Sequence, residues 1–559
     1  MGAESTTGIE QEGKRKVERD TAATVLSRRQ VAAICVLLLA IACEAVFWGW
    51  RTSLITVTAA FEAFYFVFVG FKVILAVASY LPARRGLGVL PSLDDPDLPT
   101  FTILLPNVQE KPHVLRALLE SMANMEYPAE KLQVMLLVEH WDKRTLQLFR
   151  AGPAGSVGDP DAGQGDGGDE HVGDGERIEL RPNVEVCVSV AGAPGTKPAA
   201  CDFGLRRAWG EYTVIFDSED SPDPRMLLKA VRGFRSAPPR VACLQARLVF
   251  WNILEGQLRS RQWMAAFVTR MYFVEYVVHF EFVLRGMARI GLVPPLGGTS
   301  NIFATDVLRD IAIPATDLVK GGIPQEVAEQ MIGAWDPWCV AEDADIAGWL
   351  ARSGYQVEMI PDSWTLEEAP HSLVKSAKQR ARWGKGYAQA GAVQSRHPIR
   401  AARQMGIRSL VAYALMTIGT PLSLMLNPIF WVLTFVYLIT RSAFIQSLFP
   451  APVFYLGFIT AIIGNFILFY LQVVACLRDR EPGLVKYMLA LGPWWVFTSY
   501  SMWKGVLELF IPGMRFKWHV TEHGIEDPDT ARQEIRRRHL LMSARKPEVG
   551  ALESRRGEA

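Results

Sequence analysis

The sequence contains few cysteines, and none of them stands in a pattern that binds metal. Seven of the 559 residues are cysteine, and no two have the CxxC spacing of a zinc or redox motif. This scarcity argues against a structural zinc site and a disulfide framework, and it favours a reducing compartment. The cysteines are Cys35, Cys43, Cys187, Cys201, Cys243, Cys339 and Cys476.

An excess of charge of either sign is also missing. Lysine and arginine total 59 residues and aspartate and glutamate 58, so the formal net charge is +1 at pH 7. Proteins that hold nucleic acid by electrostatic attraction carry a positive surface. The balance gives no sign of one, and we therefore expect no nucleic-acid partner.

What the sequence does have is a large share of apolar residues. Hydrophobic residues make up 50% of it, and the mean hydropathy is +0.13. That mean is too high for an ordinary soluble enzyme and too low for a bundle of membrane helices alone. A soluble domain joined to several membrane-spanning helices fits both facts.

Two long apolar runs lie near the N-terminus, at Val31–Trp50 and Ser53–Tyr80. Each reaches the roughly 20 residues that cross a bilayer core. Basic residues flank the outer ends of the pair, which predicts a hairpin with both ends in the cytoplasm. No small-residue cleavage site follows the first run, and this argues against a signal peptide.

Three more apolar regions follow later, at Ser409–Thr440, Phe454–Cys476 and Tyr487–Ile511. The first is long enough for a hairpin broken near Pro421 and Pro428, which gives about six membrane helices in all. This number keeps the basic C-terminal tail in the cytoplasm, whereas a single crossing would place the tail outside, against the charge rule. The hairpin, however, places Arg478 and its basic neighbours outside.

The region between the two apolar groups alternates strand and helix patterns. Helical patterns cover Leu115–Met125 and Lys197–Trp209. This alternation predicts an α/β domain with a mostly parallel sheet, whose ligands bind at the carboxyl ends of the strands. The expected strands are Phe101–Pro106, Leu132–Val138, Val184–Val190 and Tyr212–Phe216.

These patterns divide the chain into parts. A Gly/Asp-rich run at 151–176 has almost no large apolar residues, so we expect a disordered insertion rather than a calcium loop. The expected parts are a cytoplasmic tail at 1–30, a transmembrane hairpin at 31–80, a cytoplasmic domain at 81–400, transmembrane and interfacial helices at 401–511 and a cytoplasmic tail at 512–559.

Four short polar motifs stand in order between the apolar groups: Asp217–Asp220 (DSED), Gly297–Asn301 (GGTSN), Ala341–Asp343 (AED) and Gln379–Trp383 (QRARW). Each is weak alone. Together they resemble the family 2 glycosyltransferases of the cellulose synthase and hyaluronan synthase type, over most of the chain. The resemblance implies a GT-A-type domain between about two membrane helices before it and about four after it.

The first motif supplies two carboxylates directly after a strand pattern. Asp217 and Glu219 are suited to Mg²⁺ or Mn²⁺, which prefers oxygen ligands and keeps phosphate in its shell. The ion would stabilise charge on a departing nucleoside diphosphate. The family has a second Asp where Glu219 stands here. An acidic turn ahead of Pro222 is the alternative.

The resemblance also implies a donor-binding set. It includes an acid after the second strand, matched by Glu139 or Asp142, and a lysine that contacts the diphosphate. The family's aromatic ring near the first strand is replaced by Val108. The donor-binding candidates are Glu110, Glu139, Asp142, Lys197, Asp217, Gln379 and Arg382.

Asp343 resembles the family's general base, although the Thr that precedes the acid pair in the family is Ala341 here. A carboxylate within hydrogen-bond reach of a sugar hydroxyl can take its proton during attack. Asp345 is the local competitor for this role. The alternative is that Glu342, Asp343 and Asp345 are an acidic helix start.

The QRARW motif places Gln379 and Arg382 on one helical face with Trp383 beside them. Arg382 is expected to meet the diphosphate bidentately, and Trp383 to stack on a sugar ring. A basic, aromatic helix at the membrane surface is the alternative. The acceptor-binding candidates are Gly298, Thr299, Ser300, Asn301, Glu342 and Trp383.

The resemblance implies an inverting, processive synthase in the cell membrane. The expected donor is UDP-glucose, the product a β-glucan and the acceptor a glycan or lipid. No segment matches the arginine-plus-DxSxxG pattern of a PilZ receptor domain. One alternative is single addition of a sugar to a lipid carrier. Another is a transporter, for which Glu44, Glu62 and Lys72 within apolar runs are the best support.

Overall fold

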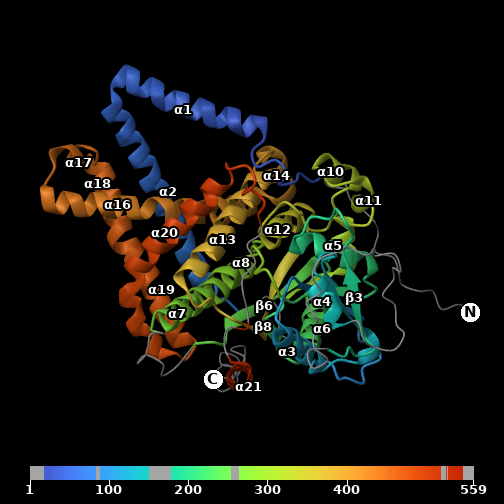
Figure 1. Cartoon of the computed structure of the whole chain (residues 1–559). Helices are drawn as coiled ribbons and strands as arrows, with labels where there is room; N and C mark the ends of the chain where they lie inside the picture. Colours follow the sequence, from blue (N-terminus) through green and yellow to red (C-terminus); the bar gives the residue numbers. More distant parts are fainter. Residues whose placement is uncertain are drawn as a thin grey trace, which may run out of the picture.

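The computed structural model describes residues 18–82, 88–149, 178–253, 263–517, 524 and 527–544. The predicted insertion at 151–176 therefore lies outside the described residues. Figure 1 shows the strands gathered on one side of the molecule and the apolar helices α1 (Arg28–Trp48), α2 (Trp50–Ala78) and α16–α20 (Thr420–Glu508) on the other. Helix α13 (Leu373–Gln394), which carries the QRARW motif, lies between them.

The N-terminal half of the sheet is parallel. Its strands are β1 (Phe101–Asn107), β2 (Leu132–Val138), β3 (Val184–Val188) and β4 (Tyr212–Ile215), in the order β3-β2-β1-β4. All four predicted strands are confirmed within two residues at each end. Alternate residues of β1 face two separate cores: Leu104 packs beneath α5 (Lys197–Arg207), and Ile103 and Leu105 pack beneath α3 (Pro112–Ala123).

The second half of the sheet is mixed. Strand β7 (Asn301–Ala304) runs antiparallel to both β4 and β6 (Val241–Phe250), β8 (Gln356–Glu367) is parallel to β6, and β5 (Ser221–Pro222) is antiparallel to β8. The predicted mostly parallel sheet is wrong for this half. Apolar runs mark buried strands but do not encode their direction.

Helices and turns cover this mixed sheet on both faces. On one face of the sheet, α6 (Met226–Ser236) packs into the same core as α3. On the other face, α12 (Glu342–Arg352) packs into the same core as α5. The remaining elements are η1 (Ala129–Lys131), α4 (Lys143–Leu148), α7 (Trp263–Val277), η3 (Val278–Leu284), α8 (Arg285–Arg289), α9 (Thr305–Asp310), α10 (Ala315–Lys320), α11 (Gln325–Ala328) and α14 (Pro398–Met405).

Four helices in the described part of the chain are long and apolar enough to cross a membrane. The first two are α1 (Arg28–Trp48) and α2 (Trp50–Ala78), which correspond to the two predicted N-terminal apolar runs. The third spans Ile407–Thr440 through α15 (Ile407–Ala414), η4 (Leu415–Gly419) and α16 (Thr420–Thr440). The fourth spans Ala451–Arg478 through α18 (Ala451–Phe458), η5 (Ile459–Gly464) and α19 (Asn465–Arg478), after the short α17 (Ala443–Ser447).

Together with Ile407 and Arg408, the region Ser409–Thr440 forms one continuous helix of 34 residues. The predicted hairpin within this region is therefore wrong. A π-helical turn at Leu415–Gly419 directly precedes Pro421, and Pro428 lies inside α16. Local π adjustments and packing against neighbouring helices let an apolar helix accommodate proline. Proline was therefore a misleading signal for a break.

The chain returns to the domain after its fourth long helix. Arg478 forms an ion pair with Glu281 at 3.1 Å, and Asp479 pairs with Arg247 of β6 at 2.7 Å. Arg478, which the six-helix arrangement placed on the opposite side of the membrane from the domain, thus lies against the domain. The described residues thus contain four long apolar helices, which corrects the expected number of about six membrane helices.

The last apolar region packs against the domain instead of forming another long span. It consists of the 3₁₀-helix η6 (Pro482–Ala490) and α20 (Leu491–Glu508). A Cβ on Gly505 would lie 2.1 Å from the carbonyl oxygen of Ala381, so α20 approaches α13 as closely as glycine allows. At the end of α20, Glu508 binds Lys385 of α13 at 3.2 Å.

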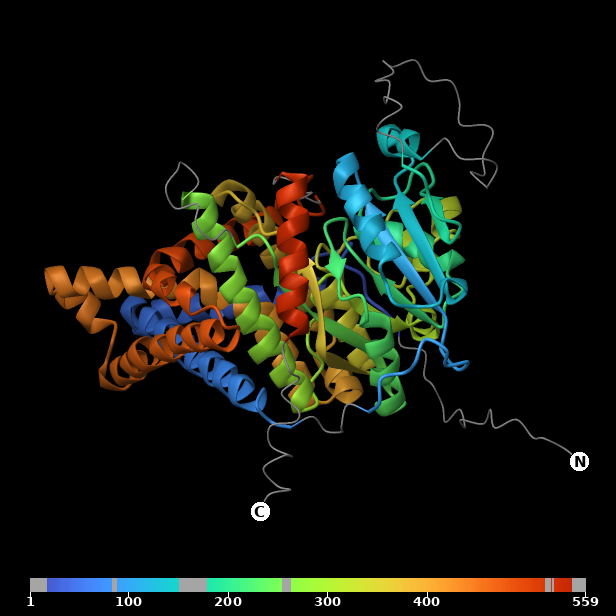
Figure 2. The ribbon, with the colours of Figure 1, turned by 90° about the horizontal axis from the view of Figure 1, so that it is seen from below.

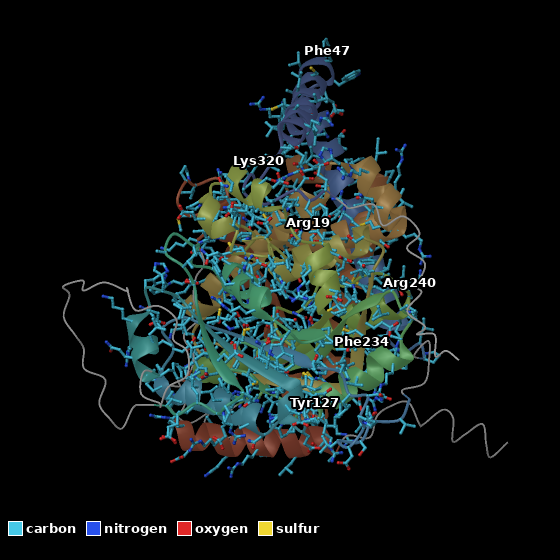
Figure 3. The ribbon with its side chains drawn as sticks, turned by 90° about the vertical axis from the view of Figure 1, so that its right-hand side faces the viewer. Arg19, Phe47, Tyr127, Phe234, Arg240 and Lys320 are labelled. Carbon is cyan, nitrogen blue, oxygen red and sulfur yellow. The ribbon has the colours of Figure 1, made fainter. Side chains whose placement is uncertain are left out.

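Both terminal segments also contact the domain. Helix α21 (Pro528–Ser543) brings His539 against Trp364 of β8, with a ring-nitrogen separation of 3.1 Å. Near the N-terminus, Arg19 is 5% exposed and donates to the carbonyl oxygens of Ile311 and Ala334. Figure 2 shows α21 alongside the sheet, and Figure 3 shows Phe47 at the tip of the α1–α2 projection, far from Arg19.

Candidate active site

One cavity of about 610 Å³ collects residues from all four polar motifs. It begins at the carboxyl ends of β1, β2 and β4 and continues between α13 and the apolar helices. Segments that are far apart in the sequence, from Glu110 to Trp383, therefore share one wall. The predicted site residues that line it are Glu110, Glu139, Lys197, Asp217, Glu219, Gly298, Thr299, Glu342, Asp343, Gln379, Arg382 and Trp383.

Lys197 connects three of the motifs. Its Nζ lies 2.5 Å from Asp217 Oδ1 and 3.8 Å from Glu342 Oε1, and it donates to the carbonyl oxygen of Gly298 at 2.8 Å. Burial acts to lower the pKa of Lys197, but the carboxylates of Asp217 and Glu342 raise it above its ordinary value. The lysine therefore stays charged and supplies a cation to this part of the cavity.

The DSED turn separates its carboxylates by role. Asp217 and Glu219 line the cavity, whereas the buried Asp220 accepts the backbone N–H of Asp217 at 2.8 Å and the hydroxyl of Thr299. Asp220 therefore shapes the turn. Burial, followed by the charges of Asp217 and Glu219, raises the pKa of Asp220 well above its ordinary value.

The cavity offers two carboxylates to a divalent ion at this turn. No group of three or more His, Cys, Asp or Glu side chains in the described residues is arranged to hold a metal. Mg²⁺ and Mn²⁺ are commonly bound by one or two carboxylates together with phosphate oxygens and water. Asp217 and Glu219 fit that mode, in which a bound diphosphate completes the shell.

The two acids after β2 have different surroundings. Glu139 lines the cavity and accepts the hydroxyl of Ser189 at 2.6 Å. Burial raises the pKa of Glu139 above its ordinary value, while that hydrogen bond and nearby Asp142 act less strongly. Asp142 is not in the cavity wall. It caps α4 through the backbone N–H of Thr145 and accepts the N–H of Gln109 at 2.7 Å.

The GGTSN loop brings its first half to the cavity and buries its second half. Gly298 has φ +81°, which favours glycine, and a Cβ there would lie 3.6 Å from Asp343 Oδ2. Ser300 is fully buried and contacts Thr365, and Asn301 begins β7. Ser300 and Asn301 therefore do not reach the cavity wall, although Gly298 and Thr299 do.

The acids of α12 point to opposite sides. Asp343 lines the cavity, and burial raises the pKa of its carboxyl to about 6 against the opposing effects of the Ala344 N–H, Lys197 and Arg382. Asp345 is fully buried and forms an ion pair with Arg19 at 3.2 Å. A base near neutrality that reaches the cavity is thus available at Asp343 and not at Asp345.

Helix α13 presents Gln379, Arg382 and Trp383 to the cavity. The Trp383 ring centroid lies 6.0 Å from Tyr272 and 6.1 Å from Tyr276, within a cluster of aromatic side chains. Arg380 also reaches the cavity but is paired with Glu275 of α7. This pairing fixes the orientation of α13 beside α7.

Sequence reasoning missed several residues of the cavity wall. Trp141 lies beside the Lys197 loop, since a Cβ on Gly195 would be 3.6 Å from its Nε1. This indole supplies an aromatic face where Val108 has none. Glu367 closes the wall at the end of β8, and its pKa is raised well above the ordinary value by burial and then by Asp220 and Glu219. Trp141 was visible as an aromatic residue after a strand; Glu367 had no signal.

Residues 212–471 match the model described as glycosyl transferase family group 2. This segment is a family 2 glycosyltransferase domain. The chain is 20% identical over 291 residues to the probable glycosyltransferase YdaM of Bacillus subtilis (strain 168), covering 52% of this chain and 56% of the relative. It is 24% identical over 190 residues to the probable glucomannan 4-beta-mannosyltransferase 7 of Oryza sativa subsp. japonica, covering 34% of this chain and 26% of that relative.

The chain thus spans about half of the first relative's length and about a quarter of the second's. Among solved structures, the chain is similar to the mannosyltransferase PcManGT from Pyrobaculum calidifontis, in complex with GDP-Man and Mn²⁺. The TM-score is 0.41 at 15% identity, covering 78% of this chain and 99% of that one. S. aureus TarS 1-349 in complex with UDP-GlcNAc gives a TM-score of 0.29 at 13% identity, covering 70% and 91%.

Proposed function

We propose that this protein is a membrane-integrated, inverting glycosyltransferase that builds a β-linked polysaccharide from a nucleotide sugar, with UDP-glucose as the donor. The observation that carries the proposal is the single cavity that joins Lys197, Asp217 and Asp343 to Trp383 and to the apolar helices. A soluble transferase would not need a cavity that continues between apolar helices.

In the proposed reaction, Lys197 and Arg382 bind the diphosphate, and Asp217 and Glu219 hold a divalent ion. The ion supplies charge stabilisation for the departing nucleoside diphosphate. The acceptor hydroxyl attacks the anomeric carbon while Asp343 takes its proton. One C–O bond forms as the bond to the diphosphate breaks, so the configuration inverts and no covalent enzyme intermediate arises.

Processive synthesis is supported by the residues that line the cavity beyond Trp383. They are Trp495 and Thr498 of α20, together with Thr420 and Leu424 of α16. Aromatic faces and small hydroxyls suit sugar rings. We place the glycosyltransferase domain in the cytoplasm, so that the product leaves between the long helices.

The second candidate is single addition of a sugar to a lipid carrier. It is favoured by the same extension of the cavity between α2 and α16, because a lipid could enter there. The two are separated by product size when membranes containing the protein receive radiolabelled UDP-glucose. Long chains beside unused acceptor support processive synthesis, whereas a product that stops after one sugar supports the lipid carrier.

The donor itself is tested by supplying UDP-glucose, UDP-N-acetylglucosamine, UDP-glucuronate and GDP-mannose in parallel. GDP-mannose is included because one relative is named as a mannosyltransferase. Transfer from UDP-glucose alone supports the proposed donor. Turnover of none of these donors by folded protein contradicts the proposed activity.

A further inference from the structure

We call the part of the cavity that is lined by α2, α16 and α20 its membrane end. One lysine, Lys72, lies in the wall of this end and has no acidic partner in the described part of the chain. Lys72 belongs to α2 and lies six residues before its last residue, Ala78, which is about 9 Å along the helix axis. Its Nζ contacts Met416 Sδ at 3.3 Å and lies 5.3 Å from the Phe68 ring centroid. A charged side chain at this depth marks a functional site by default, since it is costly to keep there.

Other enclosed lysines of the described chain have carboxylate partners. Lys197 is paired with Asp217, Lys385 with Glu508 at 3.2 Å, and Lys229 with Asp223 at 2.6 Å. No carboxylate of the described residues lies within ion-pair distance of Lys72. Glu62 is on the same helix but ten residues away, about 15 Å along the axis, and lies against Gly457.

The surroundings of Lys72 do not compensate its charge. His279 lines the same part of the cavity, and burial, followed by the charge of Lys72, lowers the pKa of its imidazole to about 3, so the ring is neutral. Glu275, the nearest acid of that wall in sequence, is paired with Arg380. This end of the cavity therefore has a net positive charge.

The other end of the cavity lies at the carboxyl ends of β1, β2 and β4, and we call it the donor end. Its wall is mainly acidic. Seven carboxyl groups line it, against the two cations Lys197 and Arg382, although burial raises the pKa of Glu139, Asp343 and Glu367. The seven acids are Glu110, Glu139, Asp217, Glu219, Glu342, Asp343 and Glu367. An anionic group on the acceptor would be repelled there unless it were the diphosphate with its metal. Lys72 offers such a group a place at the other end.

We propose that Lys72 and His279 form a binding site for an anionic group carried by the acceptor. The group is either the phosphate of a lipid-linked acceptor or the carboxylate of an acidic sugar in an acceptor glycan that the enzyme extends. Both present anionic oxygens to the three N–H donors of the ammonium. This inference rests on the proposed glycosyl transfer, and it narrows the acceptor to a charged class.

The test measures binding by the full-length protein in neutral nanodiscs, through quenching of tryptophan fluorescence. One arm compares phytanyl phosphate with phytanol, and the other compares cellotriose with cellotriose oxidised to a terminal glucuronate. Wild type should bind the charged member of one pair about 10–100-fold more tightly, as hydrogen bonds to charged groups predict. The arm that shows the preference identifies the source of the anion.

Lys72→Gln should abolish that preference while leaving binding of the neutral member unchanged, and Lys72→Arg should restore most of it. Lys486→Gln is the matched control, because Lys486 is exposed and lies outside the cavity wall. Equal or absent binding of both members in both arms, or a preference that survives in Lys72→Gln, overturns the inference. Preference without any sugar transfer would instead contradict the proposed function and leave this site in place.

Discussion

The two ends of the cavity differ in how their charges are balanced. At the donor end, Lys197 joins Asp217 and Glu342 in a compact network within 3.8 Å. At the membrane end, Lys72 contacts a thioether and an aromatic ring. Under the proposed function, the donor end would exchange its internal ion pairs for those with a metal and a diphosphate, whereas the membrane end is arranged around neutral rings and one cation.

The positions of the charged residues also distinguish an enzyme from a transporter. A transporter would place its charged groups along a path between its helices, and the long helices here carry few. The charged groups instead gather where the strands end, on residues that the glycosyltransferase motif order predicts. We therefore regard the membrane end as the exit or entry of an acceptor.

The largest effect should come from removing the metal site at the donor end. Asp217→Ala is expected to abolish sugar transfer, because Asp217 is both a carboxylate for the ion and the 2.5 Å partner of Lys197. Chelation of divalent ions by EDTA should have the same effect and be reversed by Mg²⁺ or Mn²⁺. Transfer is measured with radiolabelled UDP-glucose, and a melting curve controls for folding. Full activity in EDTA would reject a metal-dependent mechanism.

The next effect concerns the two acids of α12. Asp343→Asn should lower the transfer rate by about 10²–10⁴-fold, since an amide cannot take the acceptor proton. Donor binding should be nearly unchanged. Asp345→Asn weakens the buried contacts with Arg19 and Gln394, away from the cavity, so it should cost stability more than rate. A large rate loss in Asp345→Asn with none in Asp343→Asn would reverse the assignment.

Asp343 should also shape the pH profile. Its pKa is raised to about 6, so the base is deprotonated above that value and becomes protonated as the pH falls through it. The transfer rate of wild type should therefore decline below about pH 6. The residual rate of Asp343→Asn should lack this decline. A wild-type rate that stays level down to pH 5 would argue against Asp343 as the base.

A smaller effect, on stability, is expected at the buried contact between Arg19 and α12. Arg19→Ala leaves the buried Asp345 without its partner, and breaking a buried pair costs about 3–5 kcal/mol. The midpoint of thermal unfolding should fall, and Arg19→Lys should recover part of the loss. Arg240, exposed and labelled in Figure 3, gives the control Arg240→Ala. Equal midpoints for the two alanine variants would contradict a structural role for Arg19.

Much of the donor end could be predicted from sequence, because strand ends and motif spacing follow the chain. The apolar runs located β1 to β4, and the acids after β4 and at the start of α12 reached the cavity. Asp142 did not, because a carboxylate after a strand can equally cap its own helix, as it does through Thr145. Sequence alone does not reveal which way such a side chain turns.

The membrane end was predicted less well, for a different reason. Its wall is built from helices far apart in sequence, so no local pattern places Lys72 beside His279. Proline suggested a break at Pro421 that a π-helical turn removes. Arg19 resembled any basic residue ahead of a membrane helix, and only its contacts with Ile311, Ala334 and Asp345 show it to be buried.

The smallest effect should appear where the two ends of the cavity meet, at Trp383. Its indole lies among Tyr272 and Tyr276, and it lines the wall between the donor motifs and α20. A growing chain needs a face on which its terminal sugar stacks, whereas water needs none. Trp383→Ala should therefore lower polymer synthesis several-fold more than hydrolysis of the donor, since the large apolar face of the indole is lost to the sugar acceptor alone. Trp383→Phe should lose less than the alanine variant. Free nucleotide and polymer are counted in the same reaction, so each variant is its own control. Equal losses in both products would mean that Trp383 supports the packing of α13 and not the acceptor.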